Sequence, residues 1–493
     1  VNRGEKEKIL SVKIEFDTEI VEKDIEKQEI KRETEATAII RDAIKDSLKR
    51  LIMPSIEREI RGDLTEKAEN HAIDVFSENL RNLLLQPPMK GKQILGVDPA
   101  FRTGCKLAVI NPYGTFVAKN VIYPHPPVNK TDTAEKIVVK MINDYDIQLI
   151  AIGNGTASRE TEQFIANVIN KFNLKVQFII VNEAGASVYS ASEIARAEFP
   201  DFQVEERSAV SIGRRVQDPL SELVKIDPKS IGVGQYQHDV NQKELEKALT
   251  FVVETAVNQV GVDVNTASRS LLQYVSGLSS QIAQNLIEYR EENGAIKHHK
   301  DIAKVKRLGA KTFEQSIGFM KIVDGTEPLD NTSIHPESYD VTYQLLNQLN
   351  LKVEDLGSET LKKTLDSIDT HEIANQLNIG KPTLEDIIKS LKAPNRDPRD
   401  EFETPILKSD VLSIEDLSEG MKLSGTVRNV VDFGAFVDIG VKQDGLVHVS
   451  KLSKKFVKNP MDIVSVGDIV DVWILNIDKQ KDKVSLTMIN PHE

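Results

Sequence analysis

The first part of the chain carries apolar side chains at the spacing of amphipathic helices. Within residues 34–85 they recur every three or four positions, until two prolines interrupt the pattern in the segment 86–91. This pattern predicts long helices with one apolar face each. We therefore expect residues 1–90 to form a helical scaffold.

The pattern changes after residue 90 to short apolar runs separated by turns. Three predicted strands are followed by alternating helices and strands, which is the order of an RNase H-like α/β layer. We expect this domain at residues 91–225. The predicted strands are 93–98, 105–111, 115–122, 147–152 and 175–181, and the predicted helices are 133–145, 158–172 and several between 188 and 224.

The middle of the chain returns to helical periodicity. Two short glycine-containing turns, at 275–278 and 307–310, separate helical segments at the spacing of helix-hairpin-helix motifs. A tandem helix-hairpin-helix domain is expected at residues 226–326. Residues 327–400 are polar, helical and interrupted by prolines, which predicts a further helical domain that ends in a linker at 393–398.

The end of the chain alternates apolar and polar residues in strand-like runs at 425–440, 444–450 and 467–478. Such runs predict a small five-stranded barrel within residues 410–493. The expected fold class is therefore a multi-domain α and α/β protein with a C-terminal β-barrel. The side chains expected to line the inside of the barrel are Val427, Val431, Ala435 and Val437.

Length and charge limit the classes of function. At about 150 residues per domain, 493 residues predict three or four modules. The net charge of −13 means that any contact with nucleic acid uses local basic patches. The single cysteine, Cys105, is expected to be a core residue in a reducing compartment, the cytoplasm. We find no long apolar run and no leader pattern, which argues against membrane spans and secretion. Because the sequence opens at Val1 and not at a methionine, we expect it to be a piece of a longer protein.

Carboxylates follow the predicted strands of the RNase H-like domain. Asp98 ends the first strand, Glu160 follows the fourth, and Asp218 lies near the end of the domain. Such folds gather carboxylates at strand ends, where two Mg²⁺ or Mn²⁺ ions about 3.5–4 Å apart would activate water for phosphodiester cleavage. One hypothesis is therefore a metal-dependent nuclease in which these three acids are the catalytic and metal-binding residues.

The same three acids also have a purely structural explanation. Asp98 and Asp218 each precede a proline, where aspartate favours turns, and Glu160 suits the first turn of a helix. Glu162 and Glu222 could take the same metal-binding roles. We therefore favour a binding function, for which no cofactor is required, and keep the nuclease as the alternative.

The two hairpin turns have the chemistry of phosphate binding. A tight turn before a helix exposes backbone N–H groups that bind a phosphate oxygen whatever the base. Between residues 293 and 323, lysine and arginine outnumber acids seven to two, which favours phosphate contacts, although a solvated helix face would have the same composition. The residues expected to bind phosphate are Gly277, Gly309, Lys304, Lys306 and Lys311.

Flat rings stand in a part of the barrel that is otherwise patterned for solvent, at Phe433, Phe436 and His448. Rings on a surface stack on nucleic-acid bases with little sequence preference. A bulge or tight turn at Gly434 would place both phenylalanines on one surface. The alternative is that they are core residues of an ordinary barrel, since strict alternation puts them on opposite faces. Lysines that could contact phosphates follow at Lys451, Lys454, Lys455 and Lys458.

This last segment resembles the RNA-binding domain named after ribosomal protein S-one, which is an OB-fold. The resemblance implies an RNA-binding face. Lys451 is expected to bind RNA as well, because the turn at Gly434 would place it beside the rings. The residues that match this face are Phe433, Phe436, His448, Asp478 and Lys483.

Segments along the whole chain match one family. They are GVDPAFRTGCKLAV at 96–109, IGNGTASRETE at 152–162, the stretch 214–240, the tandem hairpins, SIHPESY at 333–339 and the terminal barrel. In this combination the chain resembles the bacterial Tex family of transcription accessory proteins. The resemblance implies a cytoplasmic nucleic-acid-binding factor linked to transcription, with a YqgF-type domain related to Holliday-junction resolvases. It also implies an N-terminal helix-turn-helix region that this chain lacks.

From these observations we expect a monomer that binds nucleic acid. The barrel would hold single-stranded RNA, or DNA, and the hairpins would hold backbone phosphates. RNA polymerase or the ribosome is the expected protein partner, and no membrane partner is expected. Two alternatives stay open: a nuclease of the RNase H or resolvase type, which would need Mg²⁺ or Mn²⁺, and a protein-interaction scaffold.

Overall fold

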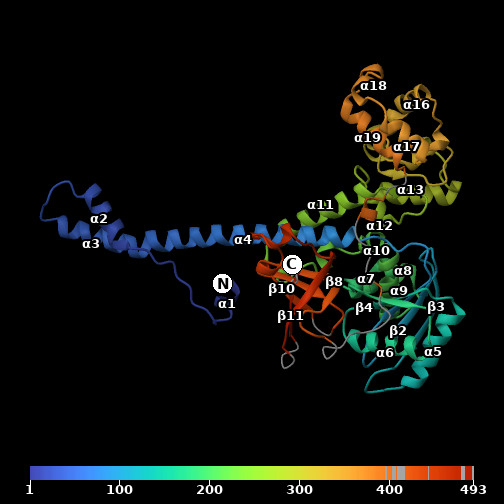
Figure 1. Ribbon diagram of the computed structural model, residues 1–493. Helices are drawn as coiled ribbons and strands as arrows, with labels where there is room; N and C mark the ends of the chain where they lie inside the picture. The colour runs from blue at the N-terminus through green and yellow to red at the C-terminus, as the bar shows by residue number, and fades with distance from the viewer. Residues whose placement is uncertain (395–396, 402–406, 408–416, 442–443, 479–482, 491–493) are drawn as a thin grey trace. The chain divides into compact units, whose positions relative to one another are not determined.

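The computed structural model describes residues 1–493 except 395–396, 402–406, 408–416, 442–443, 479–482 and 491–493 (Figure 1). Part of the predicted linker at 393–398, namely Asn395 and Arg396, lies outside the described residues. The chain divides into two compact units: residues 1–75 with 238–241, and the remainder. We describe each unit by itself.

The first unit is helical, as the apolar periodicity predicts. Its helices are α1 (Asn2–Lys6), α2 (Thr18–Glu29), α3 (Thr37–Ser47) and the first part of α4 (Met53–Leu84), with a π-helical turn, Leu48–Ile52, between α3 and α4. Pro54 is the second residue after this turn and has no N–H to donate to the carbonyl four residues earlier. A local change of helical hydrogen bonding at that place is the expected response.

The second unit begins with a five-stranded sheet in the order β3-β2-β1-β4-β5. β1 pairs antiparallel with β2 and parallel with β4, and β4 pairs parallel with β5. The strands are β1 (Ile94–Asp98), β2 (Cys105–Ile110), β3 (Phe116–Ile122), β4 (Leu149–Gly153) and β5 (Gln177–Val181). The predicted RNase H-like layer is confirmed.

Helices cover both faces of this sheet (Figure 1). α5 (Thr131–Asp144) and α6 (Ser158–Lys171) pack on one face, and α9 (Val204–Gln217) packs on the other. α9 approaches β1 so closely that a Cβ atom at Gly96 would lie 2.2 Å from the carbonyl oxygen of Ala209. The remaining helices of this domain are α7 (Ala186–Ala191), α8 (Glu193–Glu198) and α10 (Pro219–Leu223).

Two groups of helices follow. The first contains α11 (Gln242–Val260), α12 (Arg269–Leu272), α13 (Ser280–Asn293), α14 (His299–Ile302) and α15 (Ala310–Ile317), and a short parallel pairing of β6 (Val262–Asp263) with β7 (Met320–Lys321) joins its ends. The second has its own apolar core. It consists of α16 (Tyr339–Gln348), α17 (Glu359–Asp366), α18 (Thr370–Gln376) and α19 (Lys381–Lys392).

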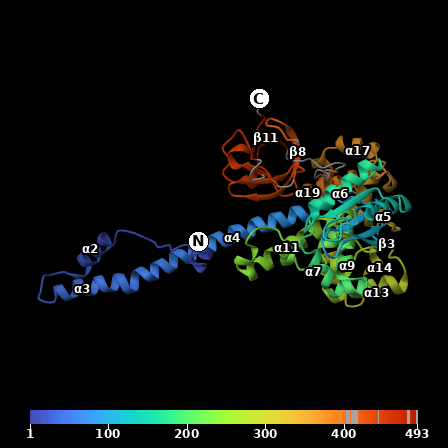
Figure 2. The ribbon, with the colours of Figure 1, turned by 90° about the horizontal axis from the view of Figure 1, so that it is seen from below.

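The chain ends in a closed five-stranded barrel with the order β10-β12-β11-β8-β9 (Figure 2). Its strands are β8 (Lys422–Val431), β9 (Gly434–Asp438), β10 (Gly445–His448), β11 (Ile469–Asp478) and β12 (Lys483–Thr487). The predicted fold class, including the terminal barrel, is therefore confirmed. Of the helices that the structure describes, none combines the length and the apolar composition needed to cross a bilayer.

One inward position of the barrel is wrong in the prediction. Val427, Ala435 and Val437 are buried as expected, but Val430 takes the inward place that was expected for Val431. The pairing of β8 with β9 shifts register between Val427 and Asn429. The extra residue in β8 moves the inward alternation by one position.

Candidate nucleic-acid interface

Two aromatic rings lie side by side at the turn between β8 and β9. Val431 pairs with Gly434, so Asp432 and Phe433 form a two-residue turn. The ring centroids of Phe433 and Phe436 are 6.2 Å apart with an interplanar angle of 87°. Phe433 is 52% exposed and Phe436 is half-buried, and neither belongs to the core of the barrel.

Gly434 makes this arrangement possible. It has φ +154°, and a Cβ atom there would lie 2.1 Å from the carbonyl oxygen of Val447 on the neighbouring strand. Only glycine allows the two strands to approach so closely where the turn ends and β9 begins. The tight turn expected at this glycine is present and leaves both phenylalanine rings on the surface.

His448 lies next to these rings on the outer surface of the barrel. It pairs with Gly434 in the β9–β10 ladder, and Phe436 pairs with Leu446, so His448 and Phe436 are diagonal neighbours on one face. The Nδ1 atom of His448 accepts the backbone N–H of Ser450 at 3.3 Å and lies 3.0 Å from its Oγ. The proton of the neutral ring is therefore on Nε2, which is left to donate to a ligand.

The other predicted RNA-binding residues lie on the strands that follow β10 around the barrel and in the loop after β10. Asp478 and Lys483 are direct partners in the antiparallel pairing of β11 with β12. β12 pairs in turn with β10, and Lys483 is exposed. Lys451 is exposed, and its carbonyl oxygen accepts the backbone N–H of Met488 at 2.9 Å. We call Phe433, Phe436, His448, Asp478 and Lys483 the barrel face; the turn at 479–482 lies outside the described residues.

The first hairpin turn has the predicted glycine. Gly277 has φ +84° and is exposed, and the N–H of Leu278 donates to the carbonyl of Val275 at 2.9 Å. Ser279 then caps α13 by accepting the N–H of Ile282 on its side chain. The other N–H groups of the first turn have no partner within the helix and are available to a phosphate.

The second hairpin turn differs from the prediction. Leu308 donates to Val305, as Leu278 does to Val275, so the residue that corresponds to Gly277 is Arg307, with φ +66°. Gly309 has φ −73° and is the N-cap of α15, where it corresponds to Ser279. The prediction placed the tight-turn glycine two positions too late, and a guanidinium group stands at the turn itself. Lys304, Lys306 and Lys311 are all exposed around this turn, as expected for phosphate contacts.

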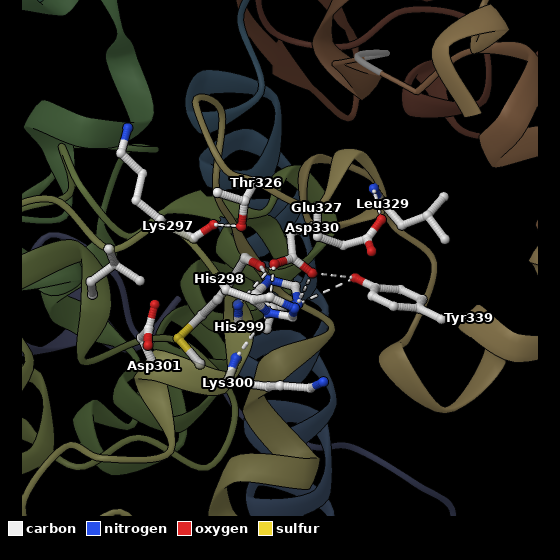
Figure 3. A network of polar contacts seen from close by, with 12 residues as sticks. Lys297, His298, His299, Lys300, Asp301, Thr326, Glu327, Leu329, Asp330 and Tyr339 are labelled. Carbon is white, nitrogen blue, oxygen red and sulfur yellow. Dashed lines mark hydrogen bonds and ion pairs between the residues drawn. The ribbon is translucent and has the colours of Figure 1, made fainter. Parts of the chain in front are cut away.

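A buried carboxylate holds the start of α14, ahead of these lysines (Figure 3). The side chain of Asp330 is fully buried and accepts the backbone N–H of His299 at 2.8 Å and the hydroxyl of Tyr339 at 2.8 Å. The Nδ1 atom of His299 is 3.0 Å from the same carboxylate, and its Nε2 is 2.7 Å from the carbonyl of Met320. Burial would raise the pKa of Asp330, but the hydrogen bond and charge of His299 outweigh it and hold the pKa below its ordinary value.

This His299–Asp330–Tyr339 network was missed by sequence reasoning. The adjacent histidines His298 and His299 were visible, but Asp330 is some thirty residues away and in a polar, proline-rich stretch. The network joins the second hairpin to the start of the following helical group (Figure 3). Its role is to fix the second hairpin in place.

The three predicted nuclease acids do not come together. Asp98 lies at the carboxyl end of β1, where burial raises its pKa to about 6. The negative charge of Glu183 also raises this pKa, whereas a hydrogen bond from Ser208 in α9 lowers it. Asp218 follows the last residue of α9, ten residues after Ser208, which corresponds to about 15 Å of helix. Glu160 is exposed in the first turn of α6.

Asp218 has a structural partner instead. It caps α10 by accepting the N–H of Ser221, and its carboxylate is 2.8 Å from the guanidinium of the buried Arg399. The alternatives Glu162 and Glu222 are buried in ion pairs with Arg159 and Lys225. Among the residues that the structure describes, no three His, Cys, Asp or Glu side chains group as a metal site. The predicted trio therefore does not fit a two-metal centre, because α9 carries Asp218 to the opposite edge of the sheet from Asp98.

Comparison with known families agrees with this succession of domains. Residues 1–76 match the model described as Tex central region-like, and residues 92–217 match the Tex protein YqgF-like domain. Residues 257–321 match the helix-hairpin-helix motif, 327–399 an HHH domain, and 416–489 the S1 RNA binding domain. The match at 327–399 was not foreseen from the polar helical pattern.

Whole-chain relatives decide the family. The uncharacterized protein YdcI of Bacillus subtilis is 62% identical over 99% of this chain and 68% of its own length. Protein tex of Bordetella pertussis is 48% identical over 89% of this chain and 55% of its own length, and transcriptional accessory protein Tex of Neisseria gonorrhoeae is 45% identical over 99% and 64%. The chain belongs to the Tex family. It spans 55–68% of the length of these three relatives.

The stretch 214–240, one of the segments on which the resemblance to Tex proteins rests, begins with residues that hold loops of the YqgF-like domain. The guanidinium of Arg215 donates to the carbonyls of Asn182 at 2.8 Å and Ala184 at 2.7 Å. The side-chain amide of Gln217 donates to the carbonyls of Lys92 at 3.0 Å and Asn111 at 2.7 Å. Burial lowers the pKa of Arg215 to about 10. These contacts are structural and bring no catalytic group to the surface.

Proposed function

We propose that this Tex chain is a nucleic-acid-binding transcription accessory factor whose barrel face holds single-stranded RNA. The observation that carries the proposal is the exposed pair of rings at Phe433 and Phe436 beside His448, on a domain that matches the S1 RNA binding domain. A base stacked on an aromatic ring contributes about 1–3 kcal/mol, and every base offers such a face. Binding is therefore weakly sequence-specific.

The hairpins add contacts that do not depend on sequence. Exposed turn residues precede α13 and α15, and exposed cationic side chains surround the second turn. The ion pair of Lys304 with Asp301, at 2.8 Å, is on the surface, where a phosphate can replace the carboxylate. Backbone phosphates of RNA or DNA are the matching ligand.

The proposed setting is transcription in the cytoplasm, because two of the relatives carry the names Tex and transcriptional accessory protein Tex. RNA polymerase or the ribosome is the proposed partner, and the binding unit is a monomer. No observation favours a nuclease as a second function, since Asp98, Glu160 and Asp218 do not group as a metal site among the described residues.

The proposal is tested directly by titrating the purified chain with a fluorescein-labelled 12-nucleotide oligouridine at low salt and following anisotropy. A duplex of the same length is the matched competitor, since its bases are stacked and cannot reach the barrel face. Tighter binding of the single strand supports the proposal. A folded chain with no affinity for either ligand at low salt would instead indicate a protein-interaction scaffold.

The lysines of the second hairpin have a separate expected effect. Exchanging Lys304, Lys306 and Lys311 for glutamine should lower the slope of log affinity against log salt by about 0.7 for each phosphate of the single strand that a lysine no longer neutralises. Base preference should not change, since phosphate contacts carry no sequence information. The measurement is the anisotropy titration repeated across a series of salt concentrations.

The matched control variant uses three lysines of the second helical group. Lysines of the barrel domain are unsuitable because they are themselves expected to contact phosphates. Lys362, Lys363 and Lys389 lie in α17 and α19 and are exchanged for glutamine. This variant carries the same change of net charge. Equal slopes for the two variants would refute a specific phosphate role of the second hairpin.

A further inference from the structure

The loop that follows β10 carries the strongest local positive charge beside the barrel face. Residues 451–458 read KLSKKFVK, with four lysines and no acid, in a chain whose net charge is −13. All four lysines are exposed. Phe456 stands among them and is 94% exposed, the largest exposure of any large hydrophobic side chain in the described part of the chain.

Phe456 is exposed although residues on both sides of it anchor the loop to the barrel core. Leu452 is buried in the core of the barrel, and Val457 packs against the same core. The N–H of Lys455 donates to the side chain of Ser453 at 3.2 Å. Val457 thus points inward while its neighbour Phe456 points into solvent, so the loop holds its apolar ring away from the core.

The start of the loop is bonded directly to the turn that carries Phe433. The N–H of Val449 donates to the carbonyl of Phe433 at 2.8 Å, immediately after His448. The carbonyl of Lys451 accepts the N–H of Met488 at 2.9 Å, which fixes the loop to the end of β12. The lysine-rich loop therefore extends the barrel face instead of forming a separate surface.

We propose that Phe456 is a further base-stacking position, and that Lys455 and Lys458 hold the phosphates on either side of the stacked base. The proposal rests on the proposed function of the barrel face and lengthens its binding track. A flexible single strand is the ligand that offers an unpaired base to the ring and negative charge to the flanking lysines together. A duplex offers only the charge, and an acidic protein segment offers no base to stack.

The experiment uses the full chain and two readouts. The first is the anisotropy titration with labelled 12-nucleotide oligouridine, for which Phe456→Ala should weaken binding about 5- to 150-fold, the range that corresponds to one stacked base. Tyr113→Ala is the matched control, since Tyr113 is 90% exposed and its sequence neighbours from Asn111 to Val117 carry no charge. Its affinity should equal that of the unmodified chain.

The second readout reports stacking itself. The chain has one tryptophan, Trp473, so the double variant Trp473→Phe with Phe456→Trp places the single indole in the loop. Its fluorescence should be quenched as unlabelled oligouridine saturates the protein. Circular dichroism of each variant checks that the barrel is still folded.

The outcomes separate this proposal from the proposed function. If Phe433→Ala weakens binding while Phe456→Ala does not, the further stacking position is refuted and the barrel face stands. If Phe456→Ala weakens binding but the indole at position 456 is not quenched, the ring does not stack on a base and the proposal is also refuted. If neither the unmodified chain nor any variant binds the oligonucleotide, the proposed function itself is refuted.

Discussion

Replacing Phe433, Phe436 and His448 with alanine is expected to weaken the binding of single-stranded RNA about 100-fold or more. Each stacked base contributes about 1–3 kcal/mol, and the contributions of neighbouring rings do not add fully, so a loss of about 3 kcal/mol is the central expectation. The two phenylalanines lie outside the barrel core, so the variant should still fold. Anisotropy of labelled oligouridine gives the affinity, and circular dichroism checks the fold.

The salt dependence of this variant distinguishes stacking from charge. The triple variant removes no lysine, so its slope of log affinity against log salt should match that of the unmodified chain even though the affinity is lower. Phe172→Ala is a suitable control, because Phe172 is 41% exposed and lies after α6 in the YqgF-like domain. An affinity of the triple variant equal to that of this control would remove the barrel face from the binding site.

Asp330→Asn is expected to have the largest effect on stability. Removing one partner of a buried charged pair typically costs about 3–5 kcal/mol, because the remaining groups stay buried without compensation. Here the uncompensated groups are the imidazole of His299 and the hydroxyl of Tyr339, both of which face the carboxylate. Hydrogen–deuterium exchange should accelerate at α14 and α16 and remain unchanged in the barrel strands.

Local exchange is the appropriate measurement, since a chain of several domains does not unfold in one step. The matched control is Asp301→Asn in α14, one of the helices whose exchange is measured; its partner Lys304 is exposed on the surface. Surface ion pairs contribute little to stability, so this control should exchange like the unmodified chain. Equal acceleration in both variants would contradict a special role of the buried network.

The network also predicts a dependence on pH with a definite sign. The pKa of Asp330 is lower in the folded state than the ordinary value, so its stabilising contribution is present above the ordinary carboxyl range and is lost as the pH falls through the folded pKa. Protection of α14 should therefore decrease in acid, below about pH 4. In Asp330→Asn this part of the pH dependence should be absent.

Patterns that repeat along one element were predictable from the sequence. The strands of the RNase H-like layer and the surface rings at Phe433 and Phe436 follow from alternation and from a glycine at a turn. Features that depend on distant segments or on backbone angles were not. The direction of α9 separates Asp218 from Asp98, and the bulge in β8 turns Val430 inward instead of Val431. The amino-acid sequence also does not show that Arg307, and not Gly309, has a positive φ angle.

The burial of Asp330 could not be predicted from the sequence either. A carboxylate in a polar stretch is normally assigned to solvent. Its burial depends on two histidines and a tyrosine that the chain brings to it from other elements. Only the three-dimensional arrangement reveals that these four side chains share one site.

The hydrogen bond between Ser450 and Nδ1 of His448 has a consequence for the choice of base. With one nitrogen occupied from within the chain, the imidazole offers an incoming nucleotide a donor and no acceptor. The carbonyl oxygens of uracil, guanine and cytosine and the ring nitrogens of adenine can accept this hydrogen bond, whereas the exocyclic amino groups of adenine, guanine and cytosine cannot. The tautomer of this ring, selected by the protein's own main chain before the ligand arrives, therefore determines which atoms of a base the imidazole can bind.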